Sequence, residues 1–489
     1  MGQKSEQLHI IFLPYMAPGH MIPMVDIARV FVSHSNIKAT IITTPTNASS
    51  MSSIKFEHKI TFLTTPLPLK DVGLPEGCEN LVSASTRDIT FKLFRAIEML
   101  HPKLESMLVD NKPDVIVSDY LYPWTVDVAN RLGIPRLAFS GSCFFNNCIS
   151  HNLEKFRPHD RIESESQEFV VPNLPDAINL TRSQLQDIVK GKTSFNALFE
   201  RLKEAEKNSF GVLMNSFYEL EHDYADYCRK EMGIKSWQIG PLFLFNKSIT
   251  SSIDHNCMQW LDSKMPKSVL YICFGSLTRF TKSQHTEMAN ALKDSGCFFI
   301  WVLGKVLKSN DNDQTKEVTE EWWLPDWFEE IITMKENGDR LGFVIKGWAP
   351  QVPILKHRAI GGFLTHCGWN SILEGVSAGV PLITWPVFAD QFYNEKLITQ
   401  VLKIGVEVGN VIWKAWATDE TEVIKNEKIK TAIRRVMGGG EEAKEIRRKV
   451  KELSDLAHKA IEKGGSSYND IKALLHVIRL HKQNKMLHN

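Results

Sequence analysis

A short turn, His366–Gly368, lies between an apolar run and a helical stretch late in the chain. The apolar run Ile360–Thr365 is typical of a buried strand, and Trp369–Gly375 has the pattern of a helix start. A helix N-terminus presents backbone N–H groups and a partial positive charge, and glycine lets a ligand approach the backbone closely. The turn therefore predicts a site for a diphosphate that needs no metal. Three side chains can add donors there: His366, Asn370 and Ser371.

A histidine and an aspartate lie near two strand ends in the first half of the chain. His20 follows the apolar run Leu8–Leu13 and the turn former Pro18-Gly19, and Asp119 follows the run Asp114–Ser118. Because the carboxyl ends of parallel strands meet at one edge of a sheet, the two side chains can come together there. An aspartate beside a histidine fixes the imidazole tautomer, and the neutral ring can then accept a proton near pH 7. Considered alone, a histidine in such a turn is more often a structural or surface residue.

Three other patterns point to different chemistry but have unsuitable surroundings. Gly375–Gly379 matches the G-x-S-x-G spacing of a hydrolase nucleophile turn, yet the residues before it are helical. A dinucleotide oxidoreductase should have a G-x-G-x-x-G motif after the first strand, but Pro14–His20 has the sequence P-Y-M-A-P-G-H instead. Asp311-Asn-Asp313 resembles an acidic triplet that holds a divalent metal, but it lies in the charged run Lys305–Glu321, which we expect to be a solvated loop. We therefore expect no metal and no cofactor.

The elements that must position these residues alternate between apolar runs and helical stretches. Runs with a strand pattern are Leu8–Leu13, Ala39–Thr43, Ile60–Leu63, Asp114–Val117, Arg136–Phe139, Ser268–Phe274, Phe298–Leu303, Gly342–Ile345 and Ile360–Thr365. Such alternation predicts parallel sheets that are covered by helices on both faces. We predict an α/β fold of two doubly wound, Rossmann-like domains that face each other across a cleft.

A polar, serine-rich stretch at 246–256 interrupts the alternation, and we interpret it as a linker. It divides the chain into an N-terminal domain of residues 1–245 and a C-terminal domain of residues 257–465. A charged helical pattern covers Asn426–Lys463, and residues 466–489 form a last helix that we expect to return to the N-terminal domain.

The composition excludes several functional classes. The 489 residues include 58 Lys and Arg against 57 Asp and Glu, so the net charge of +1 gives no general attraction to nucleic acid or anionic membranes. The eight cysteines are scattered without zinc spacing, which favours reduced thiols. The first apolar run is too short to span a bilayer and lacks a signal-peptide pattern. We expect a cytoplasmic monomer with no nucleic-acid partner and no membrane span.

The 44 residues from Trp348 to Gln391 resemble the signature of the plant secondary-product UDP-glycosyltransferases, glycosyltransferase family 1. They align without a gap, including the W-A-P-Q start, the H-C-G-W-N-S centre and the D-Q end. The G-H-M-I-P sequence at residues 19–23 is similar to the branch that acts on triterpenes and flavonoids. The resemblance implies a GT-B fold and a UDP-sugar as co-substrate.

The resemblance also implies roles in binding the UDP-sugar. Trp348 would stack on uracil, and the backbone of Ala349 would read the edge of the base. Gln351 and Glu374 would approach the ribose, for which a carboxylate is a suitable acceptor. The phosphates would be held by His366, Gly368, Asn370, Ser371 and, from the F-G-S turn, Ser276. The sugar would be lined by Trp369, Asp390 and Gln391. For a tryptophan considered alone, core packing is the alternative.

For catalysis, the resemblance matches His20 to the general base and Asp119 to its partner. His20 would take the proton of an acceptor hydroxyl as its oxygen attacks the anomeric carbon opposite the diphosphate, which inverts the configuration. Gln391 favours glucose, with xylose, galactose and glucuronate as alternatives. A non-catalytic nucleotide-sugar binding protein is a remote alternative that would need neither His20 nor Asp119.

The acceptor implied by the family is a small apolar plant metabolite with a hydroxyl group, such as a triterpenoid, a saponin or a flavonoid. Its pocket is expected in the N-terminal domain. Candidate wall residues are Trp124, Ser142, Phe144 and Phe145, each also compatible with ordinary core packing.

Overall fold

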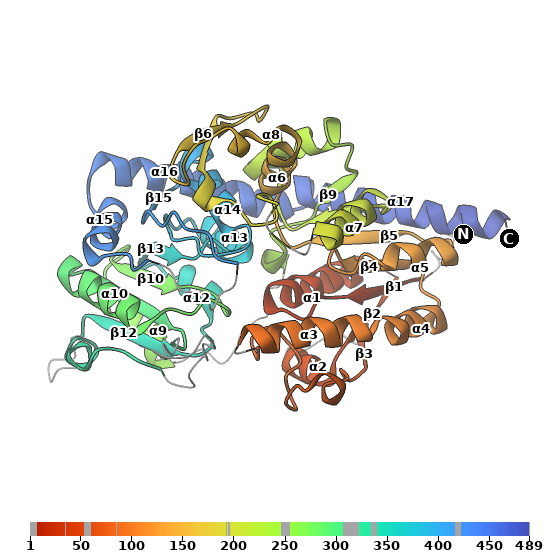
Figure 1. Cartoon of the computed structure of the whole chain (residues 1–489), viewed down its shortest axis with the longest axis horizontal. Helices are drawn as coiled ribbons and strands as arrows, with labels where there is room; N and C mark the ends of the chain where they lie inside the picture. The colour runs from red at the N-terminus through yellow and green to blue at the C-terminus, as the bar shows by residue number, and fades with distance from the viewer. Residues whose placement is uncertain are drawn as a thin grey trace. The chain divides into compact units, whose positions relative to one another are not determined.

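A computed structural model of the chain describes residues 7–34, 36–52, 60–84, 86–191, 193, 196–245, 255–306, 322–333, 340–415 and 422–488 (Figure 1). Contacts divide the chain into two compact units. The first unit comprises Met1–Phe144, Thr193–Ile249 and His458–Asn489, and the second comprises Phe145–Lys192 and Thr250–Ala457. Most of the stretch interpreted as a linker, and the acidic triplet Asp311–Asp313, lie outside the described residues.

The first unit is built on a seven-stranded parallel sheet with the order β3-β2-β1-β4-β5-β8-β9. Chain order reverses between β1 and β4, which makes their carboxyl ends the switch point where ligands bind in doubly wound sheets. The strands are β1 (Leu8–Leu13), β2 (Ile37–Thr43), β3 (Ile60–Thr64), β4 (Val115–Asp119), β5 (Arg136–Ser140), β8 (Gly211–Met214) and β9 (Ser236–Gln238).

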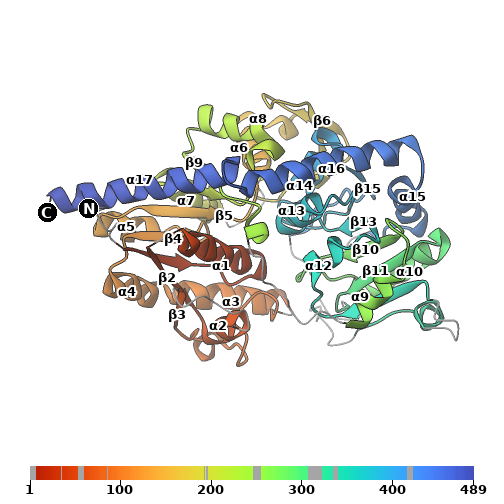
Figure 2. The same cartoon turned by 180° about the vertical axis from the view of Figure 1, so that it is seen from behind.

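Helices cover both faces of this sheet because its central strands are apolar on both sides. One face packs against α1 and α17. Ile471 and Leu474 of α17 are buried together with Ile10 and Phe12 of β1. The other face packs against α3, α4 and α5. Figure 2 shows α17 running beside β9 at the sheet edge. The helices are α1 (Pro18–Ser33), α2 (Pro45–Ser52), α3 (Arg87–Met99), α4 (His101–Asn111), α5 (Thr125–Leu132), α7 (Asn196–Lys207), α8 (Tyr218–Lys230) and α17 (Ser466–His488).

Polar contacts hold α17 along the first unit. The Asp470 carboxylate accepts the Gln238 N–H at 2.8 Å, and the Ser467 hydroxyl donates to the Gly240 carbonyl at 2.5 Å. Farther along the helix, the Lys482 ammonium donates to the Asp114 carboxylate at 3.0 Å. The C-terminal helix is therefore part of the first unit.

The second unit contains a six-stranded parallel sheet with the order β12-β11-β10-β13-β14-β15. A separate antiparallel hairpin, β6 (Glu168–Val171) with β7 (Ile178–Thr181), belongs to the same unit. The sheet strands are β10 (Val269–Cys273), β11 (Phe298–Leu303), β12 (Gly342–Lys346), β13 (Ile360–Thr365), β14 (Leu382–Thr384) and β15 (Gly405–Glu407). The helices are α6 (Phe144–Phe156), α9 (His255–Asp262), α10 (Lys282–Ser295), α11 (Glu329–Ile332), α12 (Gln351–Leu355), α13 (Trp369–Ser377), α14 (Gln391–Lys396) with a following π-helical turn (Leu397–Val401), α15 (Asn426–Met437) and α16 (Glu441–Ile461).

The predicted fold class is confirmed, since both units are Rossmann-like α/β structures around parallel sheets. The continuous helical pattern at Asn426–Lys463 is instead two helices, because Gly438–Gly440 interrupts it. The G-x-S-x-G match ends helix α13, and its Ser377 is only 1% exposed, so it does not form a nucleophile turn. Within the described ranges, no helix is long and apolar enough to cross a bilayer.

Candidate active site

The turns after two neighbouring strands, β10 and β13, enclose the imidazole of His366. A Cβ atom on Gly275 would lie 2.6 Å from its Nε2, and one on Gly368 would lie 2.5 Å from the same atom. Both values are far below an ordinary contact, so only glycine fits at either position. Burial lowers the pKa of His366 to about 4, with the Cys273 carbonyl opposing the shift only in part. The ring is therefore neutral at physiological pH, with one nitrogen as a hydrogen-bond donor and the other as an acceptor.

Helix α13 begins directly after this ring, as the sequence predicts. Gly368 is its N-cap residue and provides no capping side chain, which suits a ligand anion at the helix start. Cys367 has a left-handed backbone with φ of 65°. Its carbonyl accepts the side-chain N–H of Asn394 at 3.0 Å, so the turn is fixed from the side of helix α14. Ser276 follows Gly275, and its carbonyl accepts from the Arg279 guanidinium at 2.9 Å.

The residues expected at the nucleoside are joined by hydrogen bonds. The Gln351 amide donates to the Glu374 carboxylate at 2.6 Å and to the Ser371 hydroxyl at 3.1 Å. The Tyr271 hydroxyl donates to the Gln351 oxygen at 3.2 Å, which fixes the amide orientation. Trp348 is 71% exposed in the loop before α12, an unusual exposure for an indole and one that a stacked base would reduce.

The residues expected at the sugar lie at the start of α14 and α13. Asp390 is the N-cap residue of α14, and Gln391 is its first residue. The Gln391 side-chain oxygen accepts the N–H groups of Val387 and Phe388 at 2.8 and 3.0 Å. Because the oxygen is used, the NH₂ group is the part of this amide that can serve a ligand. Trp369 is almost fully buried at the beginning of α13.

In the first unit, His20 and Asp119 meet at the switch point. The His20 Nδ1 lies 2.7 Å from the Asp119 Oδ2, and the second carboxylate oxygen accepts the Leu121 N–H at 3.0 Å. Asp119 ends β4 and is completely buried, whereas the His20 ring in the first turn of α1 is partly exposed. Tyr15 and Tyr120 flank the ring at centroid distances of 6.0 and 6.4 Å. With Nδ1–H donated to the carboxylate, Nε2 is the basic atom.

Arg136 supports this pair and was not anticipated from the sequence. Its guanidinium donates to the Ser118 hydroxyl at 2.9 Å and to the Asp119 carbonyl at 3.2 Å, so it fixes the end of β4. Burial lowers the pKa of Arg136 to about 10, while Glu206 and Asp119 oppose the shift, and the group stays charged at neutral pH. The available signal was an arginine at the start of an apolar strand, where a charge needs a specific partner.

The four residues expected near the acceptor have different surroundings. Phe144 and Phe145 are 1% and 0% exposed, and their rings are enclosed as core residues are. Trp124 is partly buried and stacks on His101 with the ring centroids 4.2 Å apart. Ser142 is partly buried and follows Gly141, where a Cβ would lie 3.0 Å from the His20 ring. Ser142 is thus the residue that directly follows a glycine in contact distance of the His20 ring.

The structure groups the predicted residues into two sets, each within one unit. The donor-site residues from Ser276 to Gln391 belong to the second unit, and the His20–Asp119 pair belongs to the first. In the described part of the chain, no group of three or more His, Cys, Asp or Glu side chains could hold a metal ion.

Comparisons with known proteins identify the family of the chain. Residues 247–438 match the family model described as UDP-glucoronosyl and UDP-glucosyl transferase. UDP-glucosyl transferase 73CC6 of Saponaria officinalis is 45% identical over 98% of both chains. UDP-glucose flavonoid 3-O-glucosyltransferase 7 of Fragaria ananassa is 45% identical over 97% of both chains.

Solved structures show the same architecture. Glycyrrhiza uralensis UGT73P12, complexed with glycyrrhetinic acid 3-O-monoglucuronide, is 39% identical and superimposes with a TM-score of 0.88, covering 99% of this chain and 98% of the other. Medicago truncatula UGT71G1, complexed with UDP-glucose, is 25% identical with a TM-score of 0.77, covering 98% of this chain and all of the other. Full-length similarity at this level, together with the donor motif and the histidine–aspartate pair, shows that the chain belongs to the plant UDP-glycosyltransferases of family 1 and is a UDP-sugar-dependent glycosyltransferase of the GT-B fold.

Proposed function

We propose that this enzyme transfers glucose from UDP-glucose to a hydroxyl group of a small apolar plant metabolite, with inversion at the anomeric carbon. The observation that carries the proposal is the 2.7 Å contact between His20 and the buried Asp119 at the switch point of the first unit. A histidine that serves only as a structural residue does not need a fully buried, ionisable partner that orients its ring.

The catalytic step follows from this geometry. The acceptor hydroxyl gives its proton to His20 Nε2 while its oxygen forms a bond to the anomeric carbon of the donor. The bond from that carbon to the diphosphate oxygen breaks, and UDP leaves with the electron pair. Asp119 stabilises the imidazolium that forms. Attack from the face opposite the leaving group converts an α-linked donor into a β-linked product.

We assign stabilisation of the leaving diphosphate to the second unit. The start of α13 provides a helix dipole, and the neutral His366 ring and the Ser276 hydroxyl supply donors beside it. Donors that are fixed before the reaction stabilise the charge that develops on the leaving group. Backbone and neutral side-chain donors are sufficient for this role, so we propose a metal-independent reaction.

Glucose is the proposed sugar because Asp390 and Gln391 present a carboxylate and a fixed amide to a neutral hexose. Gln391 is oriented by the Val387 and Phe388 N–H groups, which leaves its NH₂ group as a donor for a sugar hydroxyl. The relatives from Saponaria and Fragaria are both named as glucosyltransferases, which supports the same donor here.

The proposed acceptor is a triterpenoid, steroidal or flavonoid alcohol. A relative from Solanum aculeatissimum that is 43% identical over 98% of both chains is named nuatigenin 3-beta-glucosyltransferase, and the Fragaria relative is named for a flavonoid. The Glycyrrhiza structure is a complex with glycyrrhetinic acid 3-O-monoglucuronide, a compound that already bears a sugar acid. Glycosylated aglycones therefore belong in the set of acceptors to be tested.

The decisive experiment combines UDP-glucose with a panel of such alcohols and compares the wild type with His20→Ala. We expect the wild type to form a β-glucoside, identified by mass spectrometry and by the anomeric proton coupling. His20→Ala should lose about 100- to 10,000-fold in kcat, because the general base is absent. Its Kd for UDP, measured by calorimetry, should remain unchanged. An unchanged kcat, or a loss of UDP binding in the folded variant, would contradict the assignment.

A further inference from the structure

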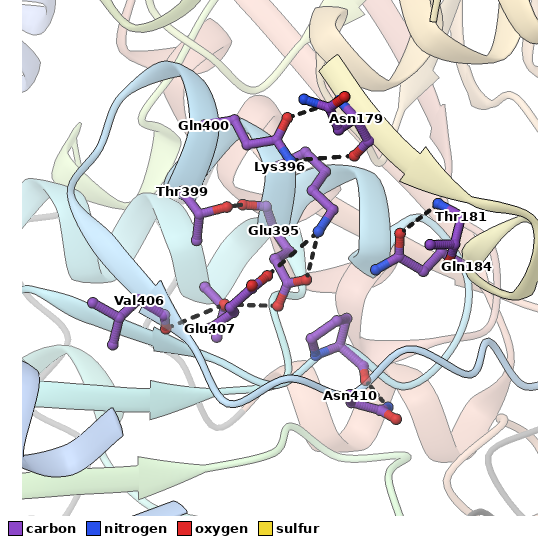
Figure 3. Close-up of polar contacts among 12 residues, drawn as sticks. Asn179, Thr181, Gln184, Glu395, Lys396, Thr399, Gln400, Val406, Glu407 and Asn410 are labelled. Carbon is purple, nitrogen blue, oxygen red and sulfur yellow. Dashed lines mark hydrogen bonds and ion pairs between the residues drawn. The ribbon is translucent and has the colours of Figure 1, made fainter. Parts of the chain in front are cut away.

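The loop that leads into the proposed sugar site is held by a distant segment of the second unit. Residues 410–414 run beside residues 386–389, with a parallel bridge between Phe388 and Lys414. Three donors of this segment reach three carbonyls of the loop. Asn410 Nδ2 donates to Pro386 at 2.6 Å (Figure 3), Lys414 N donates to Val387 at 3.0 Å, and Trp413 Nε1 donates to Ala389 at 2.9 Å. We call residues 410–414 the brace.

The last of these contacts acts at a residue of the loop that has a left-handed backbone. Ala389 directly precedes Asp390, and its backbone is left-handed with φ of 52°. This conformation is unfavourable for an L-residue with a Cβ and persists only where surrounding contacts hold it. The indole N–H of Trp413 binds the carbonyl of Ala389 itself. It therefore acts on the peptide group that joins Ala389 to Asp390.

Trp413 is itself anchored from another side. Its backbone N–H donates to the Ser183 carbonyl at 2.9 Å, in the segment that follows hairpin strand β7. The hairpin is tied to the π-helical turn after α14, because Asn179 and Gln400 exchange two hydrogen bonds of 2.9 and 3.2 Å (Figure 3). The backbone of Trp413 is thus tied to the segment after the hairpin, while its indole holds the loop.

We propose that Trp413 is a positioning residue that sets the specificity for the donor sugar. By holding the Ala389 carbonyl, it places the Asp390 carboxylate and the Gln391 amide at the start of α14. This inference rests on the proposed role of Asp390 and Gln391 at the sugar. The groups assigned to the nucleoside and phosphates lie on other elements, so loss of the contact affects binding of the sugar and leaves binding of UDP intact.

Trp413→Phe tests the proposal, since it keeps an aromatic ring and removes only the N–H donor and the second ring. We expect its Kd for UDP-glucose to rise about 3- to 10-fold, as for one lost hydrogen bond, with its Kd for UDP unchanged. The ratio of kcat/KM for UDP-glucose to that for UDP-galactose should fall. Trp413→His, which retains a ring N–H, should recover part of this selectivity.

Trp323→Phe is the matched control, because it makes the same substitution elsewhere in the second unit, where the indole lies 5.5 Å from the Lys282 ammonium. It should leave both dissociation constants unchanged. If Trp413→Phe weakens the binding of UDP and of UDP-glucose equally, the residue has a general structural role and the proposal is overturned. Unchanged binding of UDP-glucose in this variant would overturn the proposal as well. If Trp413→Phe does not fold, the same two comparisons are decided on Trp413→Leu, which also removes the N–H donor.

A separate variant distinguishes failure of this inference from failure of the proposed sugar site. Asp390→Asn in the otherwise wild-type enzyme should weaken the binding of UDP-glucose and leave the binding of UDP unchanged. If the affinity for neither ligand changes, the assignment of Asp390 to the sugar is wrong, and the proposed role of Trp413 is refuted as well. If Asp390→Asn has the expected effect and Trp413→Phe has none, only the role of Trp413 is refuted.

Discussion

Gly275→Ala offers a quantitative test of how the two glycine turns hold His366. The new Cβ would lie 2.6 Å from His366 Nε2, whereas ordinary contact begins at 3.4 Å, so the two groups must separate by about 0.8 Å. A hydrogen bond of ordinary length that opens by this amount is lost. If His366 donates to the diphosphate, the loss is one bond to a charged group, about 1.5–3 kcal/mol. The Kd for UDP should then rise about 10- to 150-fold.

The same substitution also carries a cost in backbone conformation, which a second glycine can measure separately. Gly275 has φ of +70°, and Gly296, at the end of α10, has φ of +65° with nothing within 4 Å of its Cβ position. Each alanine variant should lose about 1–2 kcal/mol in the free energy of unfolding because of the left-handed backbone. Only Gly275→Ala should also weaken UDP binding.

The measurements are urea denaturation for stability and calorimetry for the UDP affinity of both variants. If Gly275→Ala loses no more UDP affinity than Gly296→Ala, His366 either does not contact the diphosphate or moves without consequence. That result would refute the reasoning that assigns the ring to the phosphate site, even if both variants lose stability as expected.

Two further predictions concern buried groups. Asp119→Asn should reduce kcat by about 10³- to 10⁴-fold with UDP affinity unchanged, because an amide can donate to His20 Nδ1 and reverse its tautomer. A kcat near that of the wild type would show that the His20–Asp119 pair does not take part in catalysis. Burial lowers the pKa of His285 to about 4, so the unfolded chain binds a proton first as the pH falls below 6.5. Stability should therefore fall between pH 6.5 and 4 by up to about 3 kcal/mol from this group. His285→Gln, measured by urea denaturation at pH 7 and pH 5, should show a weaker pH dependence, and an unaltered dependence would contradict this account.

The sequence predicts the strands that lie deep in the sheets. The apolar runs at Leu8–Leu13 and Ile360–Thr365 match β1 and β13, because residues buried on both faces leave an uninterrupted apolar pattern. The short strands β14 and β15 were missed, since three residues are too few to display a period. The pairing of β14 with β13, and of β15 with β14, arises from the fold rather than from local pattern.

The donor motif could be predicted in detail because its parts are consecutive. A strand, a glycine turn and a helix N-terminus together define an anion site, and β13, Gly368 and α13 follow in that order. The pairing of His20 with Asp119 is different, because 99 positions separate them in the chain. It could be expected only through the rule that parallel strand ends converge, together with the family resemblance.

The residues that hold these groups in place leave no comparable trace in the sequence. Arg136 fixes Asp119 from 17 positions away, and Trp413 holds Ala389 from 24 positions away, each through a carbonyl that any residue could provide. A backbone partner places no demand on side-chain type, so these two contacts leave no paired pattern along the chain, although Arg136 also uses the Ser118 hydroxyl. A motif therefore predicts the groups that contact the ligand, whereas the supports that set their geometry become visible only in the folded structure. Substitution of such a support should alter selectivity while the motif stays intact, which is why Trp413→Phe is more informative about the donor sugar than a change within the motif.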